Sequence, residues 1–294
     1  MADELFDAII IGAGPAGLSA ATYLGRYRRR CLVLEDGNSR ARWIPTSHNI
    51  PGFAAGIGGV DFLKSFTQQA KQYGAEFRSV HATSVVRGNN TFVITTANRE
   101  TFKAPYLLMA TGTQDHLPDL PGAPEAVMRS LLRFCPICDG YEAIDKRIAV
   151  IANGPVGERE AEFLQTYSPE VTLLRLDTAK ELAHSESAIA RGIEVIAIEL
   201  SDLLIGEKAV TLKTRNGKSR PFDVLYLALG CTAQNTLAVK LGAACDEHGA
   251  LRVNPHQETT VPRLYAAGDV VRGLNQVVIA AADGAIAATD IHNK

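Results

Sequence analysis

A glycine-rich turn near the N-terminus sets the strongest limit on how this chain can fold. Residues 7–36 read DAIIIGAGPAGLSAATYLGRYRRRCLVLED, in which a short β-branched run leads into Gly12-x-Gly14-x-x-Gly17 and then into a helical stretch. A second apolar run follows and ends at Glu35. This order of strand, turn, helix and strand is typical of a dinucleotide-binding unit, and it predicts an α/β fold built on a parallel sheet.

Each residue type in this turn has a physical reason. The first glycine permits the tight turn, the second lets the backbone approach a pyrophosphate, and the third lets helix and strand pack closely. Free N–H groups at the helix N-terminus attract phosphates, and an acid after the second strand can accept hydrogen bonds from a ribose. A turn that binds nothing would leave Glu35 unexplained. We therefore predict that the dinucleotide is held by Gly12, Gly14, Pro15, Ala16, Gly17 and Glu35.

The same unit recurs later in the chain. Residues 147–177 read RIAVIANGPVGEREAEFLQTYSPEVTLLRLD, and Gly14, Pro15 and Gly17 return 140 residues later as Gly154, Pro155 and Gly157. The repeat predicts two Rossmann-like dinucleotide-binding domains. The second copy is degenerate, because Ala152 replaces the first glycine and Glu158 places a carboxylate where a helix N-terminus should attract phosphate.

A third segment near the C-terminus reads LYAAGDVVRGLNQVVIAAADGAIAATDI. It predicts a strand, then Gly268-Asp269, then a helix rich in alanine and glycine that can lie close to a sheet or a ligand. An acid at a strand end can hydrogen-bond a polyol, so Asp269 is a candidate cofactor ligand. The alternative is an Asp that caps a tightly packed core helix.

Bulk composition excludes several classes of protein. A chain of 294 residues predicts about two domains. The 30 basic and 32 acidic side chains give a net charge of -2, which argues against nucleic acid or an anionic membrane as a partner. The apolar start follows Asp3 and Glu4 rather than positive charge, unlike a signal peptide, and no run is long enough for a membrane span. The odd, low count of five cysteines favours a reducing cytoplasm.

A C-x-x-C pair stands in LLRFCPICDGYE, where Cys135 and Cys138 precede Asp139. A zinc site would need a second ligand pair, which the chain lacks, so no metal site is predicted. A structural disulfide across so short a loop would stabilise little. The pair is well suited to redox cycling, in which one thiolate attacks and the other resolves. A carboxyl with a raised pKa at Asp139 can supply the proton that dithiol release requires, although the same residue could also cap a helix.

Four motifs together resemble the low-molecular-weight thioredoxin reductase family of flavoproteins: IIIGAGPAGLSAA, MATGT at 109–113, CPICDG at 135–140 and LYAAGDV at 264–270. The resemblance implies a discontinuous FAD domain, residues 1–116 plus 246–294, with an NAD(P)H-type domain inserted at 117–245 that carries the C-x-x-C pair. It also implies a homodimer that passes electrons to a thioredoxin-like protein or a small disulfide.

The resemblance assigns roles to further residues. Cys138 is expected to face the flavin and Cys135 to attack the external disulfide. Flavin contacts are implied for residues of SHNIPGF, of MATGT and of the position of the family's RQA motif, namely Asn49, Ala110, Thr111, Gly112, Gly268, Asp269, Gln276 and Val277. The family's GGQL segment is replaced by DGNSRARWIP, so Arg40, Arg42 and Trp43 become candidates for phosphate or flavin contacts, or are simply exposed loop residues.

The electron donor is where the chain departs most from the family. The family's HRR motif for the 2′-phosphate of NADPH reads Arg175-Leu176-Asp177 here, and by length Glu35 corresponds to Arg175 or Leu176. NADPH is therefore expected to be a poor donor, and a branch of the family with degenerate nucleotide motifs takes electrons from ferredoxin. The alternatives are an ordinary NADPH-dependent thioredoxin reductase, a flavin dithiol oxidase acting on a small dithiol, and a non-catalytic flavin-binding regulator.

Overall fold

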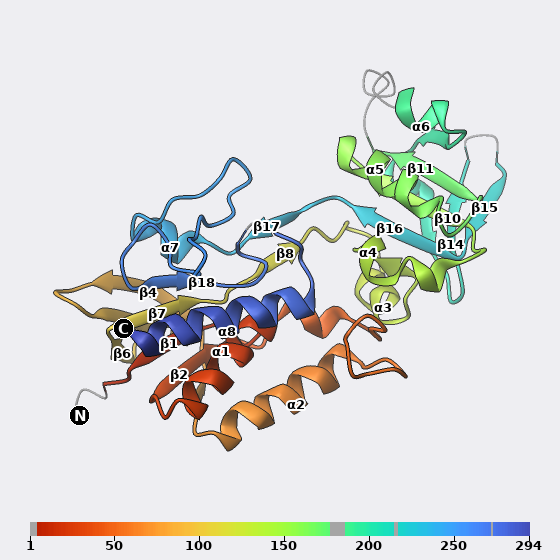
Figure 1. Ribbon diagram of the computed structural model, residues 1–294. Helices are drawn as coiled ribbons and strands as arrows, with labels where there is room; N and C mark the ends of the chain where they lie inside the picture. Colours follow the sequence, from red (N-terminus) through yellow and green to blue (C-terminus); the bar gives the residue numbers. More distant parts are fainter. Residues whose placement is uncertain (1–4, 177–185, 215–216, 272) are drawn as a thin grey trace.

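The computed structural model describes residues 5–176, 186–214, 217–271 and 273–294, and it has two lobes (Figure 1). Two short antiparallel strands join them, β8 (Thr113–Asp115) and β17 (Cys231–Ala233), with Cys231 opposite Asp115. The chain crosses from the first lobe to the second along β8 and returns along β17. The second lobe therefore lies between two segments of the first along the chain.

The first lobe is built on a five-stranded parallel sheet in the order β18-β7-β1-β2-β3. Its central strands are continuous apolar runs, as expected where helices or loops cover both faces. The strands are β18 (Leu264–Ala266), β7 (Tyr106–Met109), β1 (Ala8–Ile11), β2 (Cys31–Glu35) and β3 (Glu76–Ser79). An antiparallel sheet adds β4 (Ala82–Arg87), β5 (Phe92–Thr96) and β6 (Thr101–Ala104). The helical elements are α1 (Pro15–Arg26), η1 (Arg40–Trp43), α2 (Gly59–Gln72), α7 (Thr236–Lys240) and α8 (Val277–Asn293).

The second lobe repeats this plan. Its parallel sheet has the order β12-β11-β10-β16-β9, which matches β3-β2-β1-β7-β18 position by position. The strands are β12 (Glu194–Ala197), β11 (Val171–Arg175), β10 (Ile148–Ala152), β16 (Val224–Ala228) and β9 (Leu132–Arg133). Its antiparallel sheet comprises β13 (Leu203–Ile205), β14 (Val210–Lys213) and β15 (Ser219–Phe222). The helical elements are α3 (Ala123–Met128), α4 (Pro136–Asp139), η2 (Tyr141–Ala143), α5 (Pro155–Leu164), α6 (Glu186–Ala190) and η4 (Leu200–Asp202).

The duplication predicted from the glycine-rich turns therefore extends to whole domains, and the two-Rossmann fold class is confirmed. Strand register also settles which residue replaces Glu35 in the second copy. Ile11 lies opposite Leu34, and Ile151 lies opposite Leu174, so Arg175 occupies the position of Glu35. Of the predicted HRR-equivalent positions, Asp177 lies outside the described residues.

Helix α8 lies directly on α1 (Figure 1), and its small side chains make this possible. A Cβ at Gly284 of α8 would collide with the backbone carbonyl of Ala16, so the two helices are in backbone contact at this point. This close approach brings the start of α8, and with it Gln276, beside the β1–α1 turn. The alanine-rich helix thus packs as a core helix while its first residues reach the cavity described below.

The return to the first lobe comes earlier than residue 246. Ala238 of α7 and Ala243 are buried in the same apolar core as Phe6 and Ile9, although both lie within the predicted 117–245 insertion. We propose that the first lobe resumes directly after β17. No helix among the described ranges is long and apolar enough to cross a membrane.

Candidate active site

A cavity of about 1870 Å³ lies where the β1–α1 turn, η1, the joining strands and α4 meet. It brings together residues from both ends of the chain, from Ile11 to Ala280. Every residue predicted to bind the cofactor or to catalyse lines this cavity, with the exception of Gly17. Gly17 lies beneath the turn, where a Cβ would collide with the carbonyl of Gly12, so its role is packing.

The first glycine turn is shaped to receive a phosphate group. Gly12 has φ +108°, a left-handed conformation that favours glycine, and a Cβ there would collide with the carbonyl of Ala110. Gly14 is the N-cap of α1, where no side chain caps the helix and no acid stands in the first turn. The N–H groups of this helix N-terminus therefore face the cavity without an internal anion.

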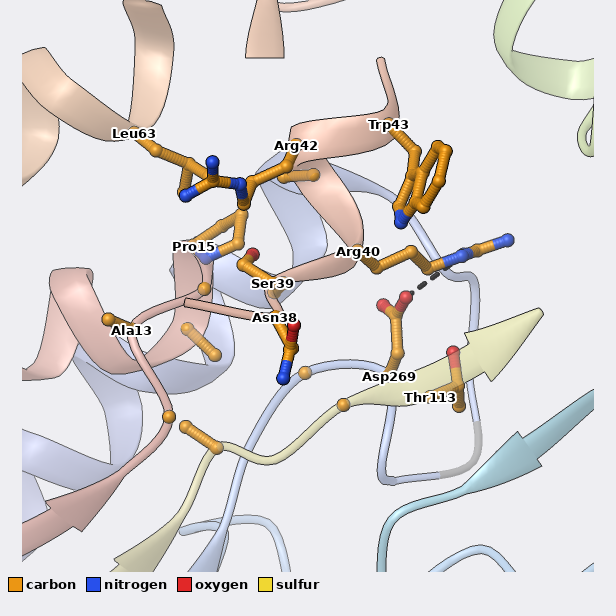
Figure 2. Close-up of a pocket in the computed structure, with 18 of the residues that line it drawn as sticks. Ala13, Pro15, Asn38, Ser39, Arg40, Arg42, Trp43, Leu63, Thr113 and Asp269 are labelled. Carbon is orange, nitrogen blue, oxygen red and sulfur yellow. Dashed lines mark hydrogen bonds and ion pairs between the residues drawn. The ribbon is translucent and has the colours of Figure 1, made fainter. Parts of the chain in front are cut away.

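Glu35 and Asp269 lie on the rim of the same cavity at the ends of two strands. Glu35 Oε2 accepts a hydrogen bond from the backbone N–H of Gly37 at 2.8 Å, which fixes the carboxylate at the end of β2. Asp269 is bound by Arg40, whose Nη1 lies 3.0 Å from Asp269 Oδ2 (Figure 2). The hydroxyl of Thr111 donates to the carbonyl of Gln234 at 2.6 Å, and both residues line the cavity.

In the substituted DGNSRARWIP segment, Arg40 has a guanidinium group that lies between two carboxylates. Besides Asp269 it holds Asp115 of β8 in a two-point contact, Nε to Oδ2 at 2.6 Å and Nη2 to Oδ1 at 2.8 Å. Both carboxylates raise the pKa of the guanidinium, against the opposing effect of burial. Arg42 and Trp43 also line the cavity and are exposed.

A chain of polar contacts leads from the first lobe to the sulfur atoms. Ser47 Oγ donates to Asn49 Oδ1 at 2.8 Å, and Asn49 Nδ2 donates to Gln276 Oε1 at 2.9 Å. Gln276 Nε2 then lies 3.3 Å from Cys138 Sγ and 3.7 Å from Cys135 Sγ. Asn49 and Gln276, both predicted from the family resemblance, thus meet at the cysteine pair, and the nearer sulfur is that of Cys138.

Cys135 and Cys138 form a disulfide across the first turn of α4. Both are half-buried, while Ile137 between them is 56% exposed. Asp139 follows at the end of α4, and burial raises the pKa of its carboxyl to about 6, against the lowering effects of Arg133 and Tyr226. A disulfide with an adjacent acid of raised pKa has the parts required for dithiol–disulfide chemistry.

The chain is similar to known proteins over nearly its whole length. Residues 6–284 match the family described as pyridine nucleotide-disulphide oxidoreductase. A thioredoxin reductase of Listeria innocua is 30% identical over 97% of this chain and 92% of its own length. The solved structure of HlmI superposes with a TM-score of 0.88 at 26% identity, over 98% of this chain and 92% of that one. Thioredoxin reductase from Streptococcus pyogenes shares the fold, with a TM-score of 0.87 at 22% identity, over 99% of this chain and 98% of that one.

The chain belongs to the pyridine nucleotide-disulphide oxidoreductase family. Its full-length similarity to thioredoxin reductases places it among the low-molecular-weight members, which are flavoprotein disulfide oxidoreductases that use FAD. The predicted family, enzyme class and FAD cofactor are therefore confirmed at the level of the family. The first turn of this chain fits FAD, because its uncapped helix N-terminus and glycine cradle can accept a pyrophosphate.

The second turn, where the family name implies a pyridine nucleotide, does not fit one. Arg175 and Glu158 are both buried, and Arg175 Nη1 lies 3.4 Å from Glu158 Oε1 and 3.2 Å from the carbonyl oxygen of Gly154. The N-terminus of α5 therefore carries its own carboxylate, and a buried arginine stands where Glu35 stands in the first copy. Ala152 is not among the residues with positive φ, in contrast to Gly12, so the turn also takes a different path.

Three side chains beside the candidate site were not predicted from the sequence. Arg133, Tyr226 and Asp115 contact predicted site residues, yet none belongs to a motif. Arg133 had a usable signal, because it is a charged residue in the otherwise apolar run LLRF directly before Cys135. Among the described residues, no group of three or more His, Cys, Asp or Glu side chains could hold a metal ion.

Proposed function

We propose that this oxidoreductase exchanges two electrons between FAD and the Cys135–Cys138 disulfide, and between that pair and an external protein or small-molecule disulfide. The observation that carries the proposal is the contact of Gln276 with both sulfurs, because it puts the disulfide in the same cavity as the first glycine turn. FAD, when bound there, supplies or accepts the electron pair.

The two sulfurs take different roles in this proposal. Cys138 faces the flavin side, in keeping with its shorter distance to Gln276, and Cys135 attacks the external disulfide. Attack by the Cys135 thiolate forms a mixed disulfide and releases one external thiolate, and the Cys138 thiolate then attacks Cys135 Sγ and releases the other. Asp139 gives a proton to the departing thiolate and takes one back when the pair is oxidised. The exposed side chains of Ile137 and Tyr141 leave a partner free access to this edge of α4.

The FAD contacts are proposed for the residues of the first turn, the rim carboxylates and the start of α8. Gly12, Gly14, Pro15 and Ala16 would hold the pyrophosphate, and Glu35 and Asp269 the ribose and ribityl hydroxyls. Around the flavin ring we place Asn49, Ala110, Gly112, Gln276 and Val277. A purified, folded protein that stays colourless after incubation with FAD would overturn this assignment.

We propose a donor other than NADPH, since the second turn is closed by the Arg175–Glu158 pair. A ferredoxin is the favoured electron donor, and a thioredoxin-like protein is the favoured acceptor. We expect the protein to act as a homodimer in the reducing cytoplasm. The deciding experiment is anaerobic addition of NADPH, NADH and reduced ferredoxin, one at a time, while the visible absorption of the flavin is recorded. Bleaching by reduced ferredoxin alone supports the proposal.

The same closed turn favours a second candidate, a dithiol oxidase that runs the chemistry in reverse and needs no nucleotide. Electrons would then pass from a small dithiol through Cys135 and Cys138 to FAD and on to oxygen. The oxidase should bleach when a dithiol is added anaerobically, and it should consume oxygen when air is admitted. A reductase should show neither ferredoxin-independent turnover nor sustained oxygen uptake.

A further inference from the structure

Two buried side chains from neighbouring strands meet at Asp139. Arg133 ends β9, Tyr226 lies in β16, and the two are directly opposite in the parallel register of the second lobe. Tyr226 is fully buried and Arg133 is 6% exposed. The sheet therefore presents a phenol and a guanidinium to the end of the short helix that carries the redox disulfide.

The contacts form a directed network. Arg133 Nη1 donates to the backbone carbonyl of Asp139 at 2.6 Å and to the hydroxyl oxygen of Tyr226 at 3.3 Å. Arginine has no acceptor, so the hydroxyl oxygen of Tyr226 can only receive a hydrogen bond from it. The tyrosine hydroxyl consequently donates to Asp139, where the carboxyl oxygen Oδ1 at 2.9 Å is a nearer acceptor than the backbone carbonyl oxygen at 3.2 Å.

We propose that Arg133 and Tyr226 are positioning residues that hold the Asp139 carboxyl in place and set the pH range in which it exchanges a proton with the Cys135–Cys138 pair. The inference rests on the proposed function, since it presumes that the pair is redox-active. Neither residue touches the reacting sulfur atoms by any contact seen here. Both act through Asp139.

An external thiolate attacks one sulfur, the S–S bond of Cys135 and Cys138 breaks, and the departing sulfur keeps the electron pair as a thiolate. Asp139 transfers its proton to that thiolate and becomes a carboxylate. The Tyr226 hydroxyl and the positive charge of Arg133 stabilise this carboxylate without giving up a proton of their own.

Opposing effects act on the carboxyl. Burial raises its pKa most strongly, and Arg133 and then Tyr226 lower it, while Glu142 of η2 raises it and Lys146 lowers it. The outcome is a pKa of about 6. Without the two positioning residues, the buried carboxyl would keep its proton to a higher pH, and its acid–base exchange with the cysteine pair would move upward in pH with it.

The test uses the full chain with FAD and the variants Tyr226→Phe, Arg133→Met and Arg133→Lys. In protein labelled with ¹³C at Asp carboxyls, Asp139→Asn identifies the Asp139 signal, which is then titrated. Removal of one hydrogen bond to the charged form should move the midpoint upward by about one pH unit in Tyr226→Phe. Arg133→Met should also move it upward, and Arg133→Lys, which keeps the charge, should move it less.

A second measurement follows the chemistry with dithiothreitol as the reductant. The rate of opening of the Cys135–Cys138 disulfide is measured from pH 5 to 9 by alkylation of the released thiols. For wild type and for Tyr226→Phe, the opening rate is divided by the rate of Asp139→Asn at the same pH. This ratio declines as pH rises, and the pH at the midpoint of the decline should be higher in Tyr226→Phe than in wild type. Tyr141→Phe, which removes an exposed hydroxyl two residues from Asp139, is the matched control and should follow wild type.

An unchanged Asp139 midpoint in both Tyr226→Phe and Arg133→Met would overturn the inference. Circular dichroism of each variant separates this result from misfolding, and Arg133→Lys remains informative if the larger changes do not fold. A wild-type pair that dithiothreitol cannot open would refute the proposed redox function instead, while the carboxyl titration would still decide the positioning role.

Discussion

Arg175 of β11 and Glu158 of α5 form a buried ion pair at the mouth of the second glycine turn, with 3.4 Å between Nη1 and Oε1. The corresponding turn of the first lobe has no acid in the first turn of its helix and has Glu35 at the end of the neighbouring strand. The two copies of the fold thus carry opposite charges at the end of the second strand and differ in whether the helix N-terminus has an acid. The first copy can accept a phosphate, whereas the second already has a carboxylate, Glu158, in the first turn of its helix.

Slow reduction by NADPH is the first expected consequence. An anionic pyrophosphate would have to approach the Glu158 carboxylate or break its ion pair, and loss of a single phosphate–arginine contact already lowers affinity by about one to two decades. In an anaerobic stopped-flow cell, micromolar NADPH should leave the flavin largely oxidised, whereas dithionite should bleach it fully. Rapid bleaching by micromolar NADPH would contradict the hypothesis that the Arg175–Glu158 pair keeps NADPH from the second glycine turn.

The ion pair also makes a prediction about stability. Removal of the arginine leaves the buried Glu158 carboxylate without its ion-pair partner, so Arg175→Met should lower the free energy of unfolding by about 3–5 kcal/mol. The double variant Glu158→Leu with Arg175→Met should recover most of this loss, since an apolar pair carries no desolvation cost. Urea unfolding measures both effects.

A surface ion pair supplies the control for that experiment. Arg191 Nε lies 3.2 Å from Glu162 Oε2, and the arginine is 60% exposed. Arg191→Met should change the free energy of unfolding by no more than about 1 kcal/mol. Equal losses for Arg191→Met and Arg175→Met would show that burial of the Arg175 pair has no energetic weight.

Arg40 is expected to support FAD binding. It balances the charges of Asp115 and Asp269, and its removal would leave two carboxylates beside the place proposed for an anionic cofactor. Arg40→Met should weaken FAD binding by about ten- to a hundredfold, measured by quenching of flavin fluorescence. Arg87→Met, an exposed residue of the same lobe outside the cavity, should bind FAD as wild type does. Equal affinity in Arg40→Met would remove Arg40 from the site.

The cysteine roles can be separated by absorption spectroscopy. Cys135→Ser should leave a Cys138 thiolate against oxidised flavin, seen as a long-wavelength charge-transfer band. Cys138→Ser should lack the band, and its flavin should be reducible but unable to pass electrons to the remaining thiol. The opposite pattern, a band in Cys138→Ser only, would reverse the assignment that the shorter contact of Cys138 with Gln276 favours.

Asp139 should make the folded protein less stable as pH rises. Its pKa is about 6 in the folded state, against 3.8 as the ordinary value, so the folded state binds more protons between these values. Stability is therefore highest below pH 4 for this group and declines through pH 6, by at most about 3 kcal/mol. Asp139→Asn should lack this decline. The free energy of unfolding is measured with urea at each pH for both proteins. An equal pH dependence in the two proteins would disprove the raised pKa.

The sequence by itself determined the local chemistry. Gly12, Gly14 and Gly17 at their spacing, with Glu35 after the next strand, predicted the first dinucleotide turn, because tight turns and close backbone approach depend on residues that are neighbours in the chain. The repeat predicted two Rossmann-like domains, and the C-x-x-C pair followed by Asp139 predicted a redox centre for the same local reason. The inserted order of the domains came from the family resemblance.

Only the tertiary structure decided how distant residues meet. The contacts at Asp139 form because β9 and β16 are neighbours in one sheet, which places Arg133 beside Tyr226. These two residues are 93 positions apart in the chain, and no local pattern encodes their pairing. The Arg40 contacts with Asp115 and Asp269 and the Arg175–Glu158 pair arise in the same way. Strand register is set by the burial of apolar faces across the whole sheet. It places Arg175 at the position of Glu35, whereas the sequence spacing allowed either Arg175 or Leu176.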